Sequence, residues 1–289
     1  MGTLSSKAAV FLFSLFVILT VTIAMRRSQT TGAKADGVQY EAIVEPDIAY
    51  GSQTKQRLDL CRPKNAIGKH GGVMIIHGGG GDKSQHRDQC KSFAERGLVA
   101  IAVNYREDPP PTWKVILGDN AMAMDWLLAR PDVDTNRIGA MGASLGGYVA
   151  SYFGTYDDPR KVDCTENNFG PMDFTDTNFE GSPLYDEAVS KFFGGVTYDE
   201  NPQLYVRLSP ISHVTADDAP KWLFTRSTND HLVPRSQFER MIAALNGVGI
   251  QTELYEYNGS GGGHANKLPP LEALKLYRKR INFMETCLR

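Results

Sequence analysis

The sequence lacks the charge features of a nucleic-acid-binding protein. Its 289 residues include 31 Lys and Arg against 33 Asp and Glu, which gives a net charge of −2. No block of basic residues and no zinc-finger spacing stands out along the chain, so charge gives no support for a nucleic-acid partner. A small neutral or mildly charged substrate fits this balance better.

Cysteine is scarce. The four cysteines are Cys61, Cys90, Cys164 and Cys287, and none forms a CxxC pair, so the spacing of a structural zinc site is missing. Four cysteines allow three pairings. One or two disulfides form if the protein is exported, and four separate thiols are the alternative. The sequence leaves both open.

One uncharged run, residues 8–25, is long and apolar enough for a secretory or membrane segment, and Arg26 and Arg27 follow it. We therefore expect a signal peptide or N-terminal membrane anchor over residues 1–27, a linker over 28–39 and a folded domain over 40–289. This predicts a secreted or periplasmic protein, or a membrane-anchored one whose folded domain lies outside the cytoplasm. Any membrane contact is expected through the N-terminal segment alone.

Strand-like and helix-like segments alternate after the linker, which predicts an α/β fold with a mostly parallel central sheet, helices on both faces and a small insertion or lid. The expected strands are 38–44, 57–60, 72–76, 98–104, 137–141, 162–168, 222–225 and 251–257. The expected helices are 88–96, 113–130, 145–152, 234–245 and 271–287. Residues 171–215 are irregular and predict the insertion.

A Gly-x-Ser-x-Gly motif places Ser144 between a predicted strand and a predicted helix. That context creates a sharp turn that exposes the serine hydroxyl at a helix N-terminus, where backbone amides favour developing negative charge. Ser144 is therefore the candidate nucleophile, and a Gly-rich structural turn with a bystander serine is the alternative.

A serine nucleophile needs a base, and three histidines follow Ser144 in the chain. His264 ends a Gly-rich loop after the last predicted strand, so we assign it as the base. His213 lies in the insertion, and His231 lies beside the candidate acid.

The acid is expected on the loop that follows the strand 222–225. Asp230 lies on that loop and is the candidate. Asp217 and Asp218 precede the strand, so we expect them to be solvated loop charges.

His77 opens a run of four glycines after a predicted strand. Glycines let backbone amides approach a substrate oxygen, so the amides of Gly79, Gly80 and Leu145 are predicted to form an oxyanion hole. His77 is expected to shape the loop. The run lacks the Lys-Ser/Thr of a phosphate-binding loop.

A zinc site would need His77 and His86 with Asp82 or Asp88. The sequence has no H-E-x-x-H motif, and these residues are better explained as loop and cap residues. We expect no metal and no cofactor.

Together the motifs resemble those of serine esterases of the α/β-hydrolase superfamily. The matching features are HGGG after a strand, GASLGG at the elbow, DHLVP, GGGH before the last helix, LDLCRP at 58–63 and NYR at 104–106. The resemblance covers residues 40–288 and points to acetyl-esterase/lipase-like and feruloyl-esterase-like enzymes related to the hormone-sensitive lipase family. Ala143 and Leu145 flank the serine, where the hormone-sensitive lipase branch usually has an acidic residue and Ala.

The resemblance implies an α/β-hydrolase catalytic domain over residues 40–289 that hydrolyses carboxylic esters. Short-chain acyl esters such as acetylated or feruloylated carbohydrate are the expected substrates. A prolyl-oligopeptidase-like serine peptidase and a non-catalytic binding protein on a hydrolase fold are the alternatives. The insertion would form a lid or acyl-pocket wall, in which four phenylalanines either line an apolar site or form the insertion's own core: Phe174, Phe179, Phe192 and Phe193.

Overall fold

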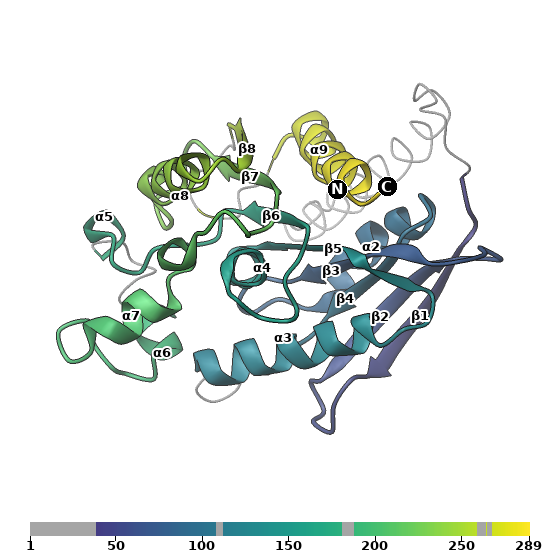
Figure 1. The fold of residues 1–289 in the computed structure, drawn as a ribbon, viewed down its shortest axis with the longest axis horizontal. Coiled ribbons are helices and arrows are strands. Elements are labelled where there is room, and N and C mark those ends of the chain that lie inside the picture. The colour runs from purple at the N-terminus through teal and green to yellow at the C-terminus, as the bar shows by residue number, and fades with distance from the viewer. Residues whose placement is uncertain (1–38, 108–111, 181–187, 259–263, 265–267) are drawn as a thin grey trace, which may run out of the picture. The chain divides into compact units, whose positions relative to one another are not determined.

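The computed structural model describes residues 39–107, 112–180, 188–258, 264 and 268–289 (Figure 1). The expected signal peptide or anchor at 1–27, and all of the linker except Gln39, lie outside these residues and stay predictions.

Within the described residues, no helix is long and apolar enough to cross a membrane.

An eight-stranded, mostly parallel sheet forms the centre of the domain, in the order β1-β2-β4-β3-β5-β6-β7-β8. β2 runs antiparallel to both of its neighbours, and from β4 to β8 every adjacent pair is parallel. The strands are β1 (Ala42–Ala49), β2 (Arg57–Pro63), β3 (His70–Ile76), β4 (Val99–Val103), β5 (Val133–Ala143), β6 (Cys164–Asn168), β7 (Lys221–Ser227) and β8 (Gln251–Tyr257). The expected fold class is confirmed.

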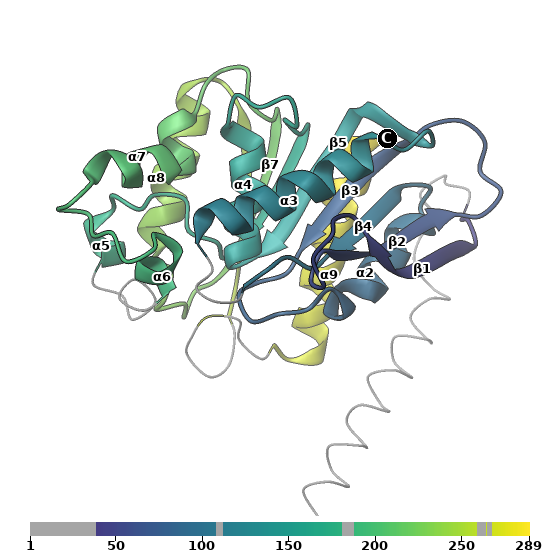
Figure 2. The ribbon, with the colours of Figure 1, turned by 90° about the horizontal axis from the view of Figure 1, so that it is seen from below.

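Helices cover both faces of the sheet (Figures 1 and 2). α3 (Trp113–Leu128), α4 (Leu145–Thr155) and α8 (Arg235–Gly247) pack on one face and bury the larger apolar core. α2 (Arg87–Ala94) and α9 (Pro270–Leu288) pack on the other face and bury a smaller core. Because both faces are covered, β4 is buried along its whole length, as its run of small and branched apolar residues predicts.

The insertion has a compact aromatic core. It contains α5 (Thr177–Glu180), α6 (Ser190–Phe192), α7 (Pro202–Leu208) and the 3₁₀ turn η3 (Pro210–His213). The four phenylalanines singled out from the sequence are all buried, at 7% exposure or less. Phe174 and Phe192 pack against Tyr148 of α4, and Phe193 stacks on Tyr205 at 3.8 Å between ring centroids. These contacts favour the alternative in which the rings form the insertion's own core.

Two disulfides answer the question that the sequence left open. Cys61 of β2 is bonded to Cys90 of α2, and Cys164 of β6 is bonded to Cys287 of α9. The alternative of four separate thiols is therefore wrong. The second bond joins residues 123 positions apart, and both bonds lie on the α2/α9 face of the sheet.

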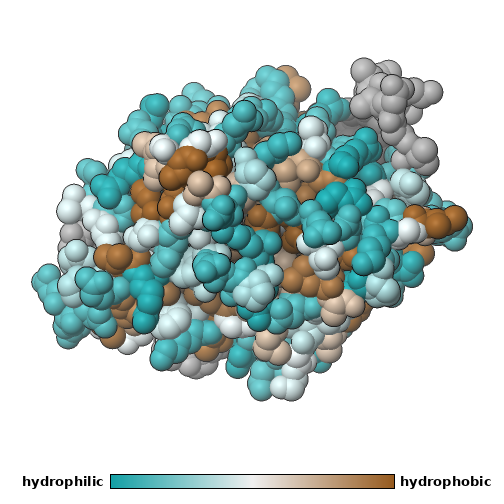
Figure 3. All heavy atoms as spheres, in the orientation of Figure 1, coloured by the Kyte–Doolittle hydropathy of each residue, from teal (hydrophilic) through white to brown (hydrophobic). Residues whose placement is uncertain are grey.

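The surface of the domain is mixed in character. Figure 3 shows hydrophilic side chains over most of the face in view, with apolar side chains in separate patches. Large apolar side chains are exposed at Ile67, Met122, Tyr198 and Leu271.

Candidate active site

Ser144 lies at the turn between β5 and α4 with a strained backbone, at φ 54° and ψ −120°. A left-handed φ is costly for a residue with a side chain, and such strain persists only where the surrounding structure enforces it. Here a Cβ on Gly142 would lie 2.4 Å from the backbone of Gly146, and a Cβ on Gly146 would lie 2.2 Å from the carbonyl oxygen of Ile76. Both motif glycines are therefore required by close packing.

The structure brings the three predicted triad residues together. Nε2 of His264 lies 2.6 Å from Oγ of Ser144, and Nδ1 lies 3.0 Å from Oδ2 of Asp230. A carboxylate can only accept, so the imidazole proton is on Nδ1, and Nε2 is left to accept from the serine hydroxyl. This is the geometry of a serine hydroxyl, a base and an orienting acid.

The carboxylate of Asp230 is held in its ionised form. Burial alone would raise its pKa, but the hydrogen bond and charge of His264 and the backbone amides of Val233 and Leu232 together outweigh burial and lower the pKa. The two amides donate to Oδ1 at 3.1 and 2.9 Å, which leaves Oδ2 to face the imidazole.

The histidines and aspartates that the sequence did not favour for the triad lie away from Ser144, and one of them differs from expectation. His213 packs against Tyr156 with the two rings tilted and bonds the carbonyl oxygen of Arg207, and His231 is exposed. Asp217 is exposed, as expected. Asp218 is 4% exposed, so the expectation of a solvated charge is wrong: its carboxylate accepts from the backbone and side chain of Thr215 and pairs with Lys161.

The glycine loop lies beside the nucleophile. A Cβ on Gly78 would lie 3.3 Å from Cβ of Ser144, and a Cβ on Gly79 would lie 3.9 Å from the side chain of Leu145. Leu145 is the first residue of α4, so its amide has no acceptor within the helix. The amide of Gly80, the other predicted oxyanion donor on this loop, already donates to Oε1 of Glu107 at 2.9 Å, so in this structure it does not face a substrate oxygen as the prediction required. No motif in the sequence singles out this carboxylate.

His77 is a buried residue that anchors the start of the glycine loop. It is 1% exposed, stacks on Tyr105 at 4.3 Å and accepts the Tyr105 hydroxyl at its own carbonyl oxygen. Burial lowers the pKa of His77, which keeps the ring neutral. These contacts fit the expected loop-shaping role.

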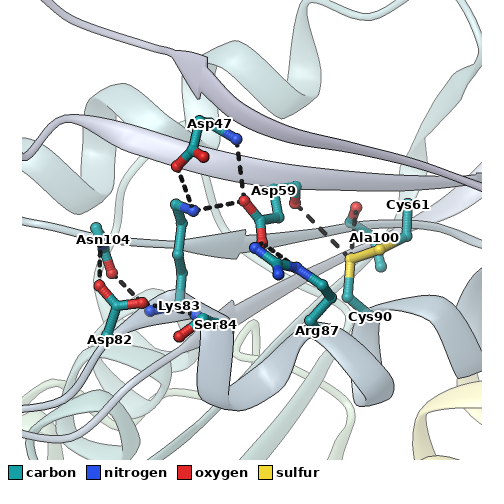
Figure 4. Close-up of polar contacts among 10 residues, drawn as sticks. All are labelled: Asp47, Asp59, Cys61, Asp82, Lys83, Ser84, Arg87, Cys90, Ala100 and Asn104. Atoms are coloured by element: carbon teal, nitrogen blue, oxygen red, sulfur yellow. Dashed lines mark hydrogen bonds and ion pairs between the residues drawn. A yellow bond between two sulfur atoms is a disulfide. The ribbon is translucent and has the colours of Figure 1, made fainter.

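An ionic network centred on the buried pair Lys83 and Asp59 holds the end of the glycine loop that leads into α2 (Figure 4). Nζ of Lys83 bonds Oδ1 of Asp59 at 2.6 Å and Oδ1 of Asp47 at 2.7 Å, and Arg87 bonds the second oxygen of Asp59. The amide of Lys83 donates to Asn104, the residue that follows β4. The loop is thus fixed at one end by β3 and at the other by β2 and β4.

We expect Asp59→Asn to lower the free energy of unfolding by at most about 3–5 kcal/mol, the cost of an uncompensated buried charge, because Lys83 loses its fully buried counter-charge and keeps only the exposed Asp47. Burial raises the pKa of Asp59, but bonds from Lys83, the Asp47 amide and Arg87 outweigh it and lower the pKa. The ionised form therefore stabilises the fold above about pH 4, and this contribution is lost as the pH falls through the folded-state pKa. Urea unfolding of the wild type and the variant at pH 7 measures the loss of stability, and the same comparison below pH 4 measures its pH dependence.

The matched control is Glu45→Gln. Glu45 pairs with Arg62 in a half-exposed bridge on the same two strands, and such bridges contribute about 1 kcal/mol or less. Equal losses in the two variants would contradict the role given to the buried network.

Phe169 was missed by the sequence analysis. It has φ 48°, which is unusual for an aromatic residue, and its ring meets that of His264 edge to face at 4.7 Å. The preceding carbonyl, of Asn168, accepts the Ser144 amide at 2.9 Å. Positive φ at a bulky residue leaves no signal in a sequence.

No cluster of three or more His, Cys, Asp or Glu side chains that could hold a metal ion occurs among the described residues. Burial lowers the pKa of His86 to about 4, and its Nδ1 faces the side chain of Gln89 at 3.3 Å.

Comparison with known proteins agrees with this architecture. A truncated form of a carbohydrate esterase from gut microbiota superposes with a TM-score of 0.64 at 19% identity, covering 88% of this chain and 99% of that one. Esterase 2 of Thermogutta terrifontis gives a TM-score of 0.62 at 22% identity, covering 84% and 93%. These likenesses show an α/β-hydrolase fold.

Among curated sequences, the chain is 28% identical over 230 residues to LipM of Mycobacterium tuberculosis, named a probable carboxylic ester hydrolase. It is 24% identical over 238 residues to the isoprenylcysteine alpha-carbonyl methylesterase ICME of Arabidopsis thaliana. These matches cover 72% and 75% of this chain, and 53% and 56% of the relatives, so the chain spans about half of their length. The BD-FAE family model matches residues 58–245, and the chain therefore belongs to the BD-FAE family.

Proposed function

We propose that the protein is a carboxylic ester hydrolase that works through an acyl-enzyme at Ser144. The observation that carries this proposal is the chain of two hydrogen bonds from Ser144 through His264 to Asp230, at 2.6 and 3.0 Å. The esterase names of its curated relatives support the same reaction class.

Each residue has a defined task in this reaction. Oγ of Ser144 attacks the ester carbonyl while Nε2 of His264 takes its proton, and the imidazolium then protonates the leaving alcohol. Asp230 fixes the imidazole tautomer and stabilises the imidazolium without taking up the proton. The amides of Gly79 and Leu145 hold the oxyanion. A water molecule then attacks the acyl carbonyl while His264 takes its proton. The imidazolium returns this proton to Oγ of Ser144 as the acyl group leaves as an acid.

We propose short-chain acyl esters, such as acetylated or feruloylated carbohydrate, as the substrates. Two solved structures with the same fold are described as a carbohydrate esterase and a bifunctional GH43-CE protein, which supports this class. Disulfides persist in oxidising compartments, so the two disulfides support action outside the cytoplasm. We propose that the N-terminal segment delivers the domain there, as a signal peptide or as an anchor.

Hydrolysis of p-nitrophenyl acetate, butyrate and octanoate by the full-length protein tests the reaction class, beside a peptide p-nitroanilide. We expect turnover of the esters, fastest for the two shorter acyl chains. The buried aromatic rings that fill the insertion leave little room there for a long acyl chain. Cleavage of the anilide alone would favour the peptidase alternative. Turnover of neither class by folded protein would favour a binding protein.

A further inference from the structure

Glu107 brings a negative charge to the edge of the candidate oxyanion site. It follows β4 by four residues, and β4 lies beside β3, from which the glycine loop leaves. Its Oε1 accepts the amide of Gly80 at 2.9 Å and would lie 3.7 Å from a Cβ on Gly79. The carboxylate therefore lies within a few ångströms of the amides expected to bind the ester oxygen.

The backbone that carries Glu107 is firmly anchored. The neighbouring Arg106 forms a two-pronged bond to the buried Asp119, at 2.6 and 2.9 Å, and its amide donates to the same carboxylate at 3.0 Å. Gln56 adds a further bond to Asp119 at 2.7 Å. This arrangement fixes the point from which the Glu107 side chain extends.

The charge of Glu107 has no cationic partner among the residues that the structure describes. Its neighbour Arg106 is engaged by Asp119, and Lys83 at the end of the glycine loop is engaged by Asp59 and Asp47. Glu107 is partly exposed, and Oε1 is the oxygen that accepts the Gly80 amide. Among the described residues, a substrate entering the site therefore meets a negative charge without a paired cation.

We propose that Glu107 is a specificity-determining residue that makes the enzyme reject esters carrying a negative charge close to the scissile bond. The inference rests on the proposed esterase function. Two unit charges about 6 Å apart, at an effective dielectric constant of about 20, repel strongly enough to change a rate by about 100-fold. The oxyanion of the reaction itself forms from every ester, so its repulsion by Glu107 cancels when an anionic ester is compared with a neutral one, and the difference reports the charge carried by the substrate.

The test compares two p-nitrophenyl esters of similar acyl length, the neutral butyrate and the anionic hemisuccinate, with spontaneous hydrolysis subtracted. In the full-length protein, Glu107→Gln removes the charge but keeps an oxygen that can accept from the Gly80 amide. We expect it to raise the ratio of kcat/KM for hemisuccinate over butyrate by about 10- to 100-fold. Raising the salt concentration should narrow the wild-type discrimination, because the charges are partly exposed.

Glu41→Gln is the matched control, since it removes the same charge at a largely exposed position directly before β1. The ratio of kcat/KM for hemisuccinate over butyrate in Glu41→Gln should equal that of the wild type. A ratio in Glu107→Gln within twofold of wild type would overturn the specificity role while leaving the esterase proposal intact. Absence of Ser144-dependent turnover of both esters in the wild type would overturn the esterase proposal, and this inference with it.

Discussion

Replacing Ser144 with alanine is expected to lower kcat for p-nitrophenyl acetate by about 10⁶-fold, to the level supported by the amides and by substrate binding alone. The methyl group cannot attack the carbonyl. The strained backbone at φ 54° is enforced by the packing of Gly142 and Gly146, so the variant should keep the wild-type fold. Steady-state kinetics, with the melting temperature as a check on folding, measure the effect.

Covalent labelling sharpens this prediction. A fluorophosphonate should add once to the wild type and to Ser212→Ala, which removes an exposed serine of the insertion, and should not add to Ser144→Ala. Unchanged turnover or labelling in Ser144→Ala would mean that another residue is the nucleophile.

Asp230→Asn should lower kcat by about 10⁴-fold. The Asn oxygen can still accept from the amides of Leu232 and Val233, which turns its NH₂ group toward Nδ1 of His264. The imidazole proton then moves to Nε2, and the ring cannot accept the proton of Ser144. The kinetics of the variant at neutral pH measure this loss.

Asp230 also has a predictable effect on stability. Its pKa is lowered in the folded state, so the ionised carboxylate stabilises the fold above about pH 4, and this contribution disappears as the pH falls through the folded-state pKa. Urea unfolding of the wild type and Asp230→Asn at pH 7 and below pH 4 measures this contribution.

For the loss of kcat, Asp217→Asn is the matched control, because Asp217 is exposed and precedes β7. Comparable losses of kcat in the two variants would contradict the role assigned to Asp230.

The nucleophile turn and the sheet could be predicted because their signals are local. Strand and helix patterns flank Ser144 directly, and repeated strand–helix units dictate a parallel sheet. The meeting of Asp230 and His264 could be predicted from chain order, because each follows a strand whose carboxyl end faces the same edge. The structure brings their side chains together, and their catalytic roles remain predictions.

What escaped prediction depends on contacts between distant segments. The disulfide pairing requires knowing that Cys61 and Cys90 share one face of the sheet with Cys164 and Cys287. The bond from Gly80 to Glu107 requires the loops after β3 and β4 to meet, which follows only from the strand order. The burial of Asp218 depends on Lys161 and Thr215, which the sequence pattern does not connect to it.

The placement of both disulfides on one face gives the domain two layers with different tolerance to reducing agents. The layer of α3, α4 and α8 is held by apolar packing and by hydrogen bonds such as those to Asp119 of α3, whereas α2 and α9 cover a smaller core and are also tied covalently to β2 and β6. We therefore expect reduction to loosen the α2/α9 layer before the other. Because α2 follows the glycine loop after a single turn, we expect a reduced chain to become sensitive to protease on this face and beside this loop while the larger core still holds.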